Sequence, residues 1–500
     1  MGLFGRNEGT GRSNYPASGM QVQGTNALRG VIQAGYVSGD ADSENRLVRY
    51  HLGWKFYRNK HWNKDNDKLL SFNYVRAFID KVNDFLAGKE GFTTNVYDLY
   101  GREVPEELER SMEALVEYIW RYNRKGVRVQ EMLQMGGVCG DVFIFLDIKK
   151  EIESVKLTVL DSRMVLPVFE NGDRNNLVAY MIVEPMAYNE DKFVQKVREY
   201  RLVQGKTQEL TYFKKGTERD APRFREKTVE TDLPFLPIVH IKNHPSSDEW
   251  SGTPDTQDIL KLNKIYNECA EDVRTIIAYY ATPTTVITGA VVGDLKRGAN
   301  NIWSGLPSEA QVFNLGLGED LSASMNFLKM LKDAMHDFSG VPENTLGKLQ
   351  AVSNTSGAAL HIMYQPLIEA ANKKWLSYAA GVEEVNKRAL WIMQNVFPAH
   401  ELVKEVTLHN GSKPLDTNRF FATPVFTYAL PVDRALQLSE AQIELQTHIA
   451  SRKEIMTRLG KRNIPIIETQ ITADREADNK FAADLAKAST PPEPPTPKKE

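Results

Sequence analysis

The chain has 500 residues, of which 42% are hydrophobic and 25% charged, and its formal net charge is −3. This apolar content excludes a wholly disordered chain, and the length predicts about three structural regions. Without a basic excess, tight sequence-independent binding to DNA is not expected, although looser contact with DNA inside a channel is compatible with this charge.

The N-terminal residues 1–45 are polar and glycine-rich, which predicts a flexible arm. They hold no apolar stretch of signal-peptide length, and Arg6 stands where a myristoylation signal requires Ser or Thr. No run of about 18 apolar residues occurs, so we expect no membrane span and a protein made in the cytoplasm. The two cysteines, Cys139 and Cys269, are expected to be small hydrophobes in a reducing compartment.

The first half of the chain changes from helical to β-rich character. Apolar residues at helical spacing predict a helix within 47–91 and two more at 106–124 and 127–135. Short apolar or β-branched runs then predict strands at 141–147, 155–160, 177–183, 199–203, 210–213 and 236–243. Helices followed by a β-rich layer indicate an α+β fold.

The second half begins with a long helix predicted at 254–281, which would reach about 40 Å, with Asp255 in its acidic first turn. The insert 283–318 contains two strand-like pieces, 285–288 and 311–314, and a return helix is predicted at 321–338. Two helices that bracket a small insert are unusual in a compact enzyme domain, where connections are mostly short.

The remaining elements follow a polar loop at 340–356. A helix is predicted over 357–397 with a kink at Pro366, because proline removes a backbone hydrogen bond and clashes with the preceding turn. Further predictions are strands at 403–408 and 424–428, helices at 433–459 and 468–487, and a disordered proline-rich tail at 488–500.

A search for catalytic motifs finds little. The Gly205-Lys206-Thr207 triplet lacks the first glycine of a P-loop, because Tyr200 stands in its place. His240 lies in an apolar strand, which is typical of a satisfied core histidine. His336 and His361 flank the polar loop and fit solvated or interface positions better than a metal site.

Two sets of residues are compatible with a function on nucleic acids. Asp141 and Asp147 lie six positions apart on one strand, so both point to the same face, where they would hold Mg²⁺ in a nuclease or simply close the ends of a buried strand. The aromatic residues of segment 54–62 lie among basic ones and would stack on bases or pack in a core or interface. They are Trp54, Phe56, Tyr57 and Trp62.

The order of short motifs along the chain is more specific than any single one. They are Pro237–Asn243, Gly252–Asp255, Ser339–Pro342, Ser356–Leu360 and Pro366-Leu367. In this order and spacing the chain resembles the portal proteins of tailed bacteriophages, the head-tail connectors, especially those of long-tailed phages. The resemblance covers roughly residues 45–485. Thr253-Pro254 departs from it, since many relatives carry Ser or Arg there, and this affects only the local helix cap.

The resemblance implies an α+β portal fold with an α+β wing, a two-helix stem, a small α/β clip, a long kinked helix and a helical C-terminal crown. The implied regions are the arm 1–45, the wing 46–253, stem helices 254–282 and 319–339, the clip 283–318, the tunnel loop 340–356, the kinked helix with the second part of the wing 357–432, the crown 433–487 and the tail 488–500.

The resemblance also implies a function in the virion, with assembly in the host cytoplasm. Portal subunits form a ring, usually of twelve, at one capsid vertex, and double-stranded DNA passes through it during packaging and ejection. The implied partners are the terminase large subunit, the head-completion or neck proteins, and the major capsid and scaffolding proteins. No catalytic residue, metal or cofactor is expected, because the separate motor hydrolyses ATP.

Candidate site residues follow from these regions. For the DNA channel they are Glu343, Asn344, Lys348, Gln350, Ser353 and Asn354 in the tunnel loop, with Lys329 and Lys332 in the stem. For partner binding by the clip they are Lys296, Arg297, Asn300 and Trp303. The stem helices mix lysines with acidic residues, which suits a channel that does not hold DNA fast but also describes an ordinary solvated helix face.

Two other functions stay open. A metal-dependent nucleic-acid enzyme would use Asp141 and Asp147 and would be active as the isolated chain. Another virion structural protein, such as a capsid or neck component, would not need a bracketed insert followed by a long kinked helix.

Overall fold

The structure, a computed structural model, describes residues 41–61, 70–88, 91–170, 173, 176–186, 194–215, 222–247, 249–281, 284–289, 307–315, 321–346, 357–426, 434–459, 467–477 and 480. The chain divides into two compact units, Met1–Ala429 and Leu430–Glu500. The expected N-terminal arm therefore lies almost wholly outside the described residues, as does the proline-rich tail.

The described part of the first unit begins with helices α2 (Ala41–Tyr57) and α3 (Tyr74–Ala87), and after a strand come α4 (Glu106–Tyr122) and α5 (Lys125–Cys139). The region 47–91 thus holds two helices where the spacing predicted one, since only α3 carries a strong apolar stripe. Trp54, Phe56 and Tyr57 are buried, which confirms that they pack in a core, whereas Trp62 lies outside the described residues.

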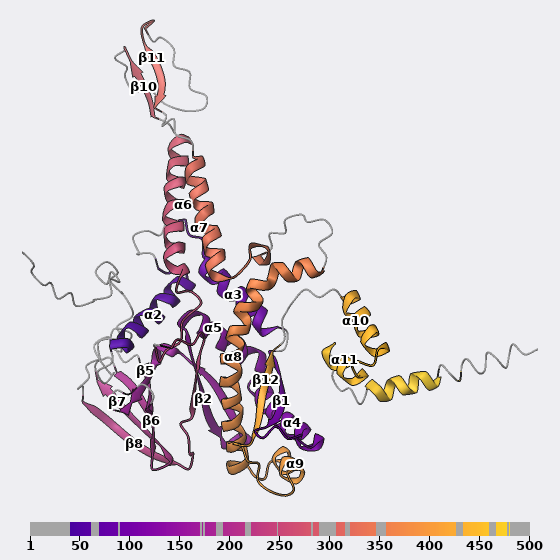
Figure 1. The fold of residues 1–500 in the computed structure, drawn as a ribbon. Coiled ribbons are helices and arrows are strands. Elements are labelled where there is room, and N and C mark those ends of the chain that lie inside the picture. Colours follow the sequence, from indigo (N-terminus) through magenta and orange to yellow (C-terminus); the bar gives the residue numbers. More distant parts are fainter. Residues whose placement is uncertain are drawn as a thin grey trace, which may run out of the picture. The chain divides into compact units, whose positions relative to one another are not determined.

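Two antiparallel sheets lie beside these helices (Figure 1). The first has the strand order β3-β2-β9, and the first six residues of its central strand β2 are buried. The second has the order β4-β5-β6-β7-β8. The strands are β2 (Asp141–Lys149), β3 (Ser154–Leu160), β4 (Val165–Phe169), β5 (Leu177–Met186), β6 (Val194–Val203), β7 (Lys206–Lys215), β8 (Arg223–Thr231) and β9 (Ile238–Lys242). The predicted strands of this region are confirmed, whereas β4 and β8 were not predicted.

A separate two-stranded sheet joins distant parts of the chain. Strand β1 (Phe92–Asp98) pairs antiparallel with β12 (Phe420–Phe426). The segment predicted as a strand at 403–408 is instead helix α9 (Glu401–His409), so that prediction is wrong. Its β-branched residues suggested a strand, but Val403 and Val406 are buried three positions apart, which is helical spacing.

The predicted helix, insert and return helix are all present as α6 (Ile259–Ala281), the paired strands β10 (Thr284–Thr288) and β11 (Gln311–Leu315), and α7 (Ser322–Ser339). Figure 1 shows α6 and α7 side by side. Helix α6 begins five residues later than predicted, because residues 255–258 form turns and Asp255 is held by side chains outside the helix.

A short 3₁₀ turn, η5 (Glu343–Leu346), follows α7, and the long helix α8 (Gly357–Val396) comes next with Pro366 inside it. Helix α8 turns in its first part (Figure 1), as the proline predicts. Helix α8 packs against β12 and β9, so it contacts both the β1-β12 sheet and the β3-β2-β9 sheet, which we call the two small sheets.

The described residues of the second unit are mostly helical. The helix predicted over 433–459 is in fact two, α10 (Arg434–Gln446) and α11 (Arg452–Arg458). His448 adopts a left-handed backbone conformation between them, which ends the first helix. Residues 467–477 are helical, in agreement with the start of the last predicted helix.

Candidate functional site

Helices α6 and α7 form an antiparallel pair around a small apolar core. Ala270 and Val273 of α6 pack against Leu328 of α7, with Tyr266 and Cys269 beside them. The contact arises because each helix repeats apolar residues at helical spacing on the side that faces the other helix. This core occupies one side of each helix, and the other sides make different contacts.

An extended segment, residues 70–73, runs along one side of α6 and leads into Tyr74, the first residue of α3; we call this segment the strap. Three polar side chains of α6, four positions apart, hold its backbone. Asn263 accepts from the Tyr74 amide (3.2 Å), and Glu271 accepts from the Leu70 amide (3.0 Å). Between them, Asn267 accepts from the Phe72 amide (2.7 Å) and donates to the Phe72 carbonyl (3.1 Å).

The sides of α6 and α7 that face away from each other are polar and of mixed charge. On α6 this outer face carries Lys261, Lys264, Glu268 and Asp272. On α7 it carries Asn326, Asp333 and Asp337, with Lys329 at its border. Lysines and acidic residues nearly balance, so these faces have little net charge.

The root of α7 is tied to the segment that follows it. The His336 ring nitrogen Nδ1 lies 2.7 Å from the Val341 carbonyl, and Lys332 forms an ion pair with Glu343. Lys332 and Glu343 therefore neutralise each other, whereas the exposed Lys329 has no ion pair among the described residues. Asn344 lies in η5, half-buried.

A buried ion cluster holds the start of α6 against α8. Both carboxylate oxygens of Asp255 are occupied: Lys374 of α8 donates to one (2.6 Å), and Asn243 donates to the other (2.8 Å), where the His244 ring also lies at 2.9 Å. Burial alone would raise the pKa of Asp255, but the Lys374 ammonium and the His244 ring hold this pKa well below its usual range. The Lys374 side chain is only 1% exposed, so the pair is shielded from solvent.

A second buried carboxylate, Asp141 at the start of β2, ties β2 to β9 and α2. It accepts a hydrogen bond from Tyr50 and one from the Gly252 amide (2.7 Å), and the His240 ring nitrogen lies 2.6 Å away. Burial alone would raise the pKa of Asp141, whereas His240 and the Arg46 guanidinium lower it. His240 stacks on both Phe143 and Trp250, which confirms its expected place as a satisfied core histidine.

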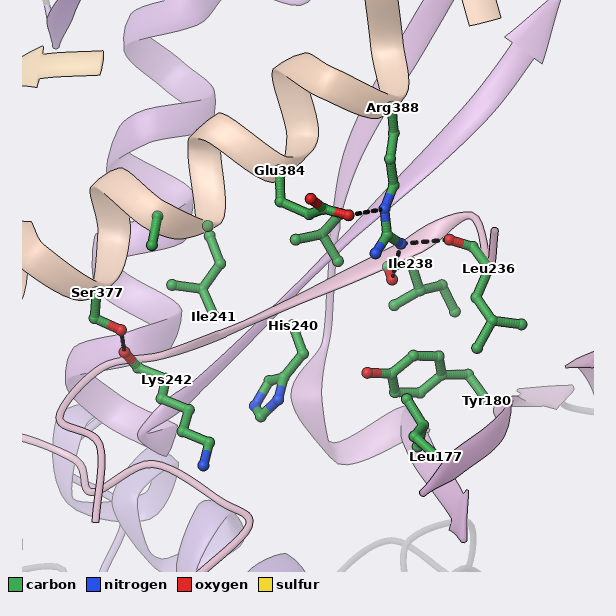
Figure 2. A pocket seen from close by; sticks show the side chains of 13 residues that line it. Leu177, Tyr180, Leu236, Ile238, His240, Ile241, Lys242, Ser377, Glu384 and Arg388 are labelled. Atoms are coloured by element: carbon green, nitrogen blue, oxygen red, sulfur yellow. Dashed lines mark hydrogen bonds and ion pairs between the residues drawn. The ribbon is translucent and has the colours of Figure 1, made fainter. Parts of the chain in front are cut away.

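Figure 2 shows the cleft between β9 and α8. Arg388 of α8 donates to the carbonyls of Leu236 (2.5 Å) and Ile238 (2.9 Å), and Ser377 donates to the Lys242 carbonyl. These side chains cover the outer edge of β9, which would otherwise present unpaired carbonyl groups. The cleft is thus a joint between helix and sheet, with its polar groups already used.

The described residues do not bring a catalytic pair together. Asp141 and Asp147 lie at opposite ends of β2, about 20 Å apart at the usual rise of a strand. Asp141 is fully buried, and Asp147 is paired with Lys149. No group of three or more His, Cys, Asp or Glu side chains in the described part of the chain has the geometry of a metal site.

Several sequence-predicted site residues lie outside the described residues. For the clip these are Lys296, Arg297, Asn300 and Trp303. For the tunnel loop they are Lys348, Gln350, Ser353 and Asn354. The backbone of residue 361 is described as part of α8. His336 is buried rather than solvated, with Nδ1 at the Val341 carbonyl and Nε2 without a hydrogen-bond partner among the described residues.

The residues that hold α6 in place were not predicted from the sequence. Asn263, Asn267 and Glu271 recur every four positions on one side of α6, a spacing that signals a polar stripe with a specific partner. Lys374 gave no such signal, because a lone lysine on a long helix is normally solvated.

In the fold, the α6–α7 pair brackets an insert and is followed by a long proline-containing helix. Together with the family comparison, this arrangement identifies the chain as a phage portal subunit. A family model described as "Phage portal protein, SPP1 Gp6-like" matches residues 40–468. The chain belongs to this SPP1 Gp6-like family of phage portal proteins. Portal proteins are structural components of the virion of tailed phages, and they act as multimeric rings joined to capsid and tail parts.

Among solved structures, a chain of a "Virion of native gene transfer agent (GTA) particle" is similar at 14% identity. The match covers 87% of this chain and 99% of that chain, with a TM-score of 0.39. A comparison with curated proteins finds no match. The family assignment therefore rests on the family model.

Among the described residues, no helix has both the length and the apolar character needed to cross a lipid bilayer.

Proposed function

We propose that the chain assembles into a ring of about twelve subunits at one capsid vertex, as the resemblance to portal proteins implies. DNA enters through this ring during packaging and leaves through it during ejection. The ring docks the terminase large subunit first and the neck proteins afterwards. Membership of the portal family supports this proposal, together with the α6–α7 pair and its bracketed insert.

The regions keep the bounds expected from the sequence. In this proposal α6 and α7 form the stem, and the insert 283–318 forms the clip. Residues 340–356 form the tunnel loop, and helix α8 with the two small sheets belongs to the wing. The second compact unit, which contains α10 and α11, forms the crown.

The observation that carries the proposal is the balance of charge on the outer faces of α6 and α7. Each phosphate contact made by a lysine or arginine adds to DNA affinity, so a basic lining would hold DNA fast. The outer face of α6 pairs two lysines with Glu268 and Asp272, and that of α7 sets Lys329 against Asp333 and Asp337. Such a surface neither traps nor strongly repels a passing duplex.

The tunnel loop provides the direct test of this function. Rings that carry Lys348→Ala and Gln350→Ala should still form, as judged by electron microscopy, but should package less DNA or retain it less well. Lys404→Ala, on the exposed side of α9, is the matched control and should package normally. Normal packaging by the loop variants would contradict the channel assignment.

The clip provides a second test. Charge reversal at Lys296 and Arg297 should weaken binding of the ring to the motor or to the neck protein, with Asn300 and Trp303 as neighbouring contact candidates. The measurement is affinity of assembled rings for each purified partner. Unchanged binding to both partners would show that these residues do not form the docking surface.

The proposed function needs no catalytic residue in this chain, because the separate motor hydrolyses ATP. The rival function, a metal-dependent nuclease, finds no support in the 20 Å or so between Asp141 and Asp147. A nuclease assay of the isolated chain with Mg²⁺ should show no cleavage.

A further inference from the structure

Exposed apolar residues of α7 lie to either side of the direction that faces α6, and Ile277 of α6 is exposed as well. A residue advances about 100° around a helix, so directions can be compared by position. On α7 the residues that are buried toward α6 are Leu328, Leu331 and Met335. To one side of that direction lie Phe327 and Phe338, about 75° and 55° away, and Met330, about 135° away at the border of the outer face. Their side chains are 42%, 67% and 56% exposed. We call these three residues the open side.

The opposite side of the pair also exposes apolar groups. Met325 of α7 lies about 90° from the α6-facing direction, on the side opposite to Phe327. His336 points the same way, and the Met325 side chain is 55% exposed. On α6, Asn263, Asn267 and Glu271 hold the strap, whose Leu70 and Phe72 are 39% and 41% exposed.

The strap and Met325 lie on the same side of the pair. Helix α3 follows the strap directly, and its Phe78 contacts His336 of α7 edge to face, with ring centroids 5.1 Å apart. His336 and Met325 share one direction on α7, so the strap on α6 and Met325 on α7 face the same way. We call Leu70, Phe72 and Met325 the strap side. It faces away from the open side, and the outer faces between the two sides are polar, with Met330 at the border of the outer face of α7.

Two different apolar surfaces on opposite sides of one rod cannot cover each other within a single chain. They can do so between copies that repeat head to tail, whereas a twofold dimer would bring like surfaces together. The strap bonds also set the height of the surfaces. Leu70 and Phe72 lie level with Glu271 and Asn267, the part of α6 that packs near Leu328, about one turn from Met330.

We propose that the strap side of one subunit packs against the open side of the next subunit, so that Leu70, Phe72 and Met325 contact Phe327, Met330 and Phe338. This inference rests on the proposed ring function and deepens it by assigning the two tangential sides of the stem. The polar outer faces of α6 and α7 then point along the radius, one toward the channel and one outward.

Engineered disulfides test the assignment. In a Cys269→Ser background, Leu70→Cys and Met330→Cys are made singly and together, and assembled rings are oxidised and run on a non-reducing gel. Cys139 is fully buried and stays in place. The double variant should give a ladder of cross-linked chains. Mixed single variants should give dimers only, because each chain then carries one engineered thiol.

The control pairs Leu70→Cys with Asp333→Cys, which lies on the polar outer face of α7 and should not cross-link. Rings that form normally but give no ladder with Leu70→Cys and Met330→Cys would overturn the inference and leave the proposed function intact. Cross-linked dimers from either single variant alone would overturn it as well, because they require a twofold contact. Failure of the unmodified chain to form rings would instead count against the proposed function.

Discussion

Lys374 and Asp255 form the buried ion pair that joins α8 to the start of α6. Removal of one partner leaves the other charge buried and uncompensated. We therefore expect Lys374→Met to lower the free energy of unfolding by about 3–5 kcal/mol, measured by denaturant titration. Arg76→Met, which breaks an exposed pair with Asp80, is the control and should leave stability almost unchanged. Equal losses of unfolding free energy in the two variants would show that the buried pair stabilises the protein no more than the exposed one.

His51 of α2 makes stability sensitive to mild acid. It is buried, and neither ring nitrogen has a hydrogen-bond partner among the described residues. Burial, together with Lys55 and Arg163, lowers the pKa of His51 to about 4. The unfolded chain, with an ordinary histidine pKa of about 6.5, binds more protons between these values, so this histidine costs stability as the pH falls from 6.5 toward 4.

The His51→Phe variant should therefore lose less thermal stability than the unmodified chain when the pH is lowered from 7 to 5. The measurement is Tm at both values for both proteins. A parallel decrease in the two proteins would show that His51 does not titrate in this range.

Residues whose environment follows from their neighbours in the chain were predictable, and residues held by distant partners were not. His240 was expected to be a satisfied core histidine because its neighbours in the chain are apolar, and the structure confirms this. Asp255 was expected in the first turn of a helix, where an acidic residue suits the helix dipole. Its actual partners, Asn243 and Lys374, are 12 and 119 positions away, and no local pattern reveals contacts of that kind.

At the scale of elements, helix α8 approaches β9 at a glycine. A Cβ atom added to Gly381 would lie 2.4 Å from Cγ1 of Ile241, so the helix or the strand would have to move. We expect Gly381→Ala to destabilise the protein by about 1–3 kcal/mol. Gly126→Ala in α5, where nothing lies within 4 Å, should instead stabilise it by about 0.5–1 kcal/mol. Changes of the same sign in thermal unfolding would contradict this packing argument.

The strap depends on Asn267, which both accepts from and donates to the Phe72 backbone. Asn267→Ala should release the strap and speed hydrogen exchange of the Phe72 amide at least tenfold, while the α6 backbone stays protected. Asn395→Ala, which removes an exposed bond to the Trp391 carbonyl, is the control. Unchanged exchange at Phe72 would mean that the strap is held by its aromatic contacts alone.

Helices with many apolar residues at regular helical spacing were predictable from the sequence. Strand β1, which depends on pairing with a distant part of the chain, was not. Helices α4 and α8 follow from spacing alone, and Pro366 predicted the turn in α8. Strand β1 was missed because its partner β12 lies more than 300 positions away. Helix α9 was mistaken for a strand because β-branched residues favour strands unless tertiary packing decides otherwise.

At the scale of the whole molecule, the order of short motifs was more informative than any composition. The family match over residues 40–468 agrees with the resemblance over roughly 45–485. The helix pair and its insert were predicted in outline, because two segments with apolar residues at helical spacing flank a segment rich in Gly and Thr. Which sides of that pair expose apolar groups was not predictable, because it depends on how α3 and the strap pack against it.

The central claim is that this chain forms a ring around a channel, and electron microscopy of the purified protein with its mass measured in native buffer tests it most directly. We expect closed rings of about a dozen subunits with a central hole. A uniform population of monomers or twofold dimers, still present after capsid and scaffolding partners are added, would contradict the account.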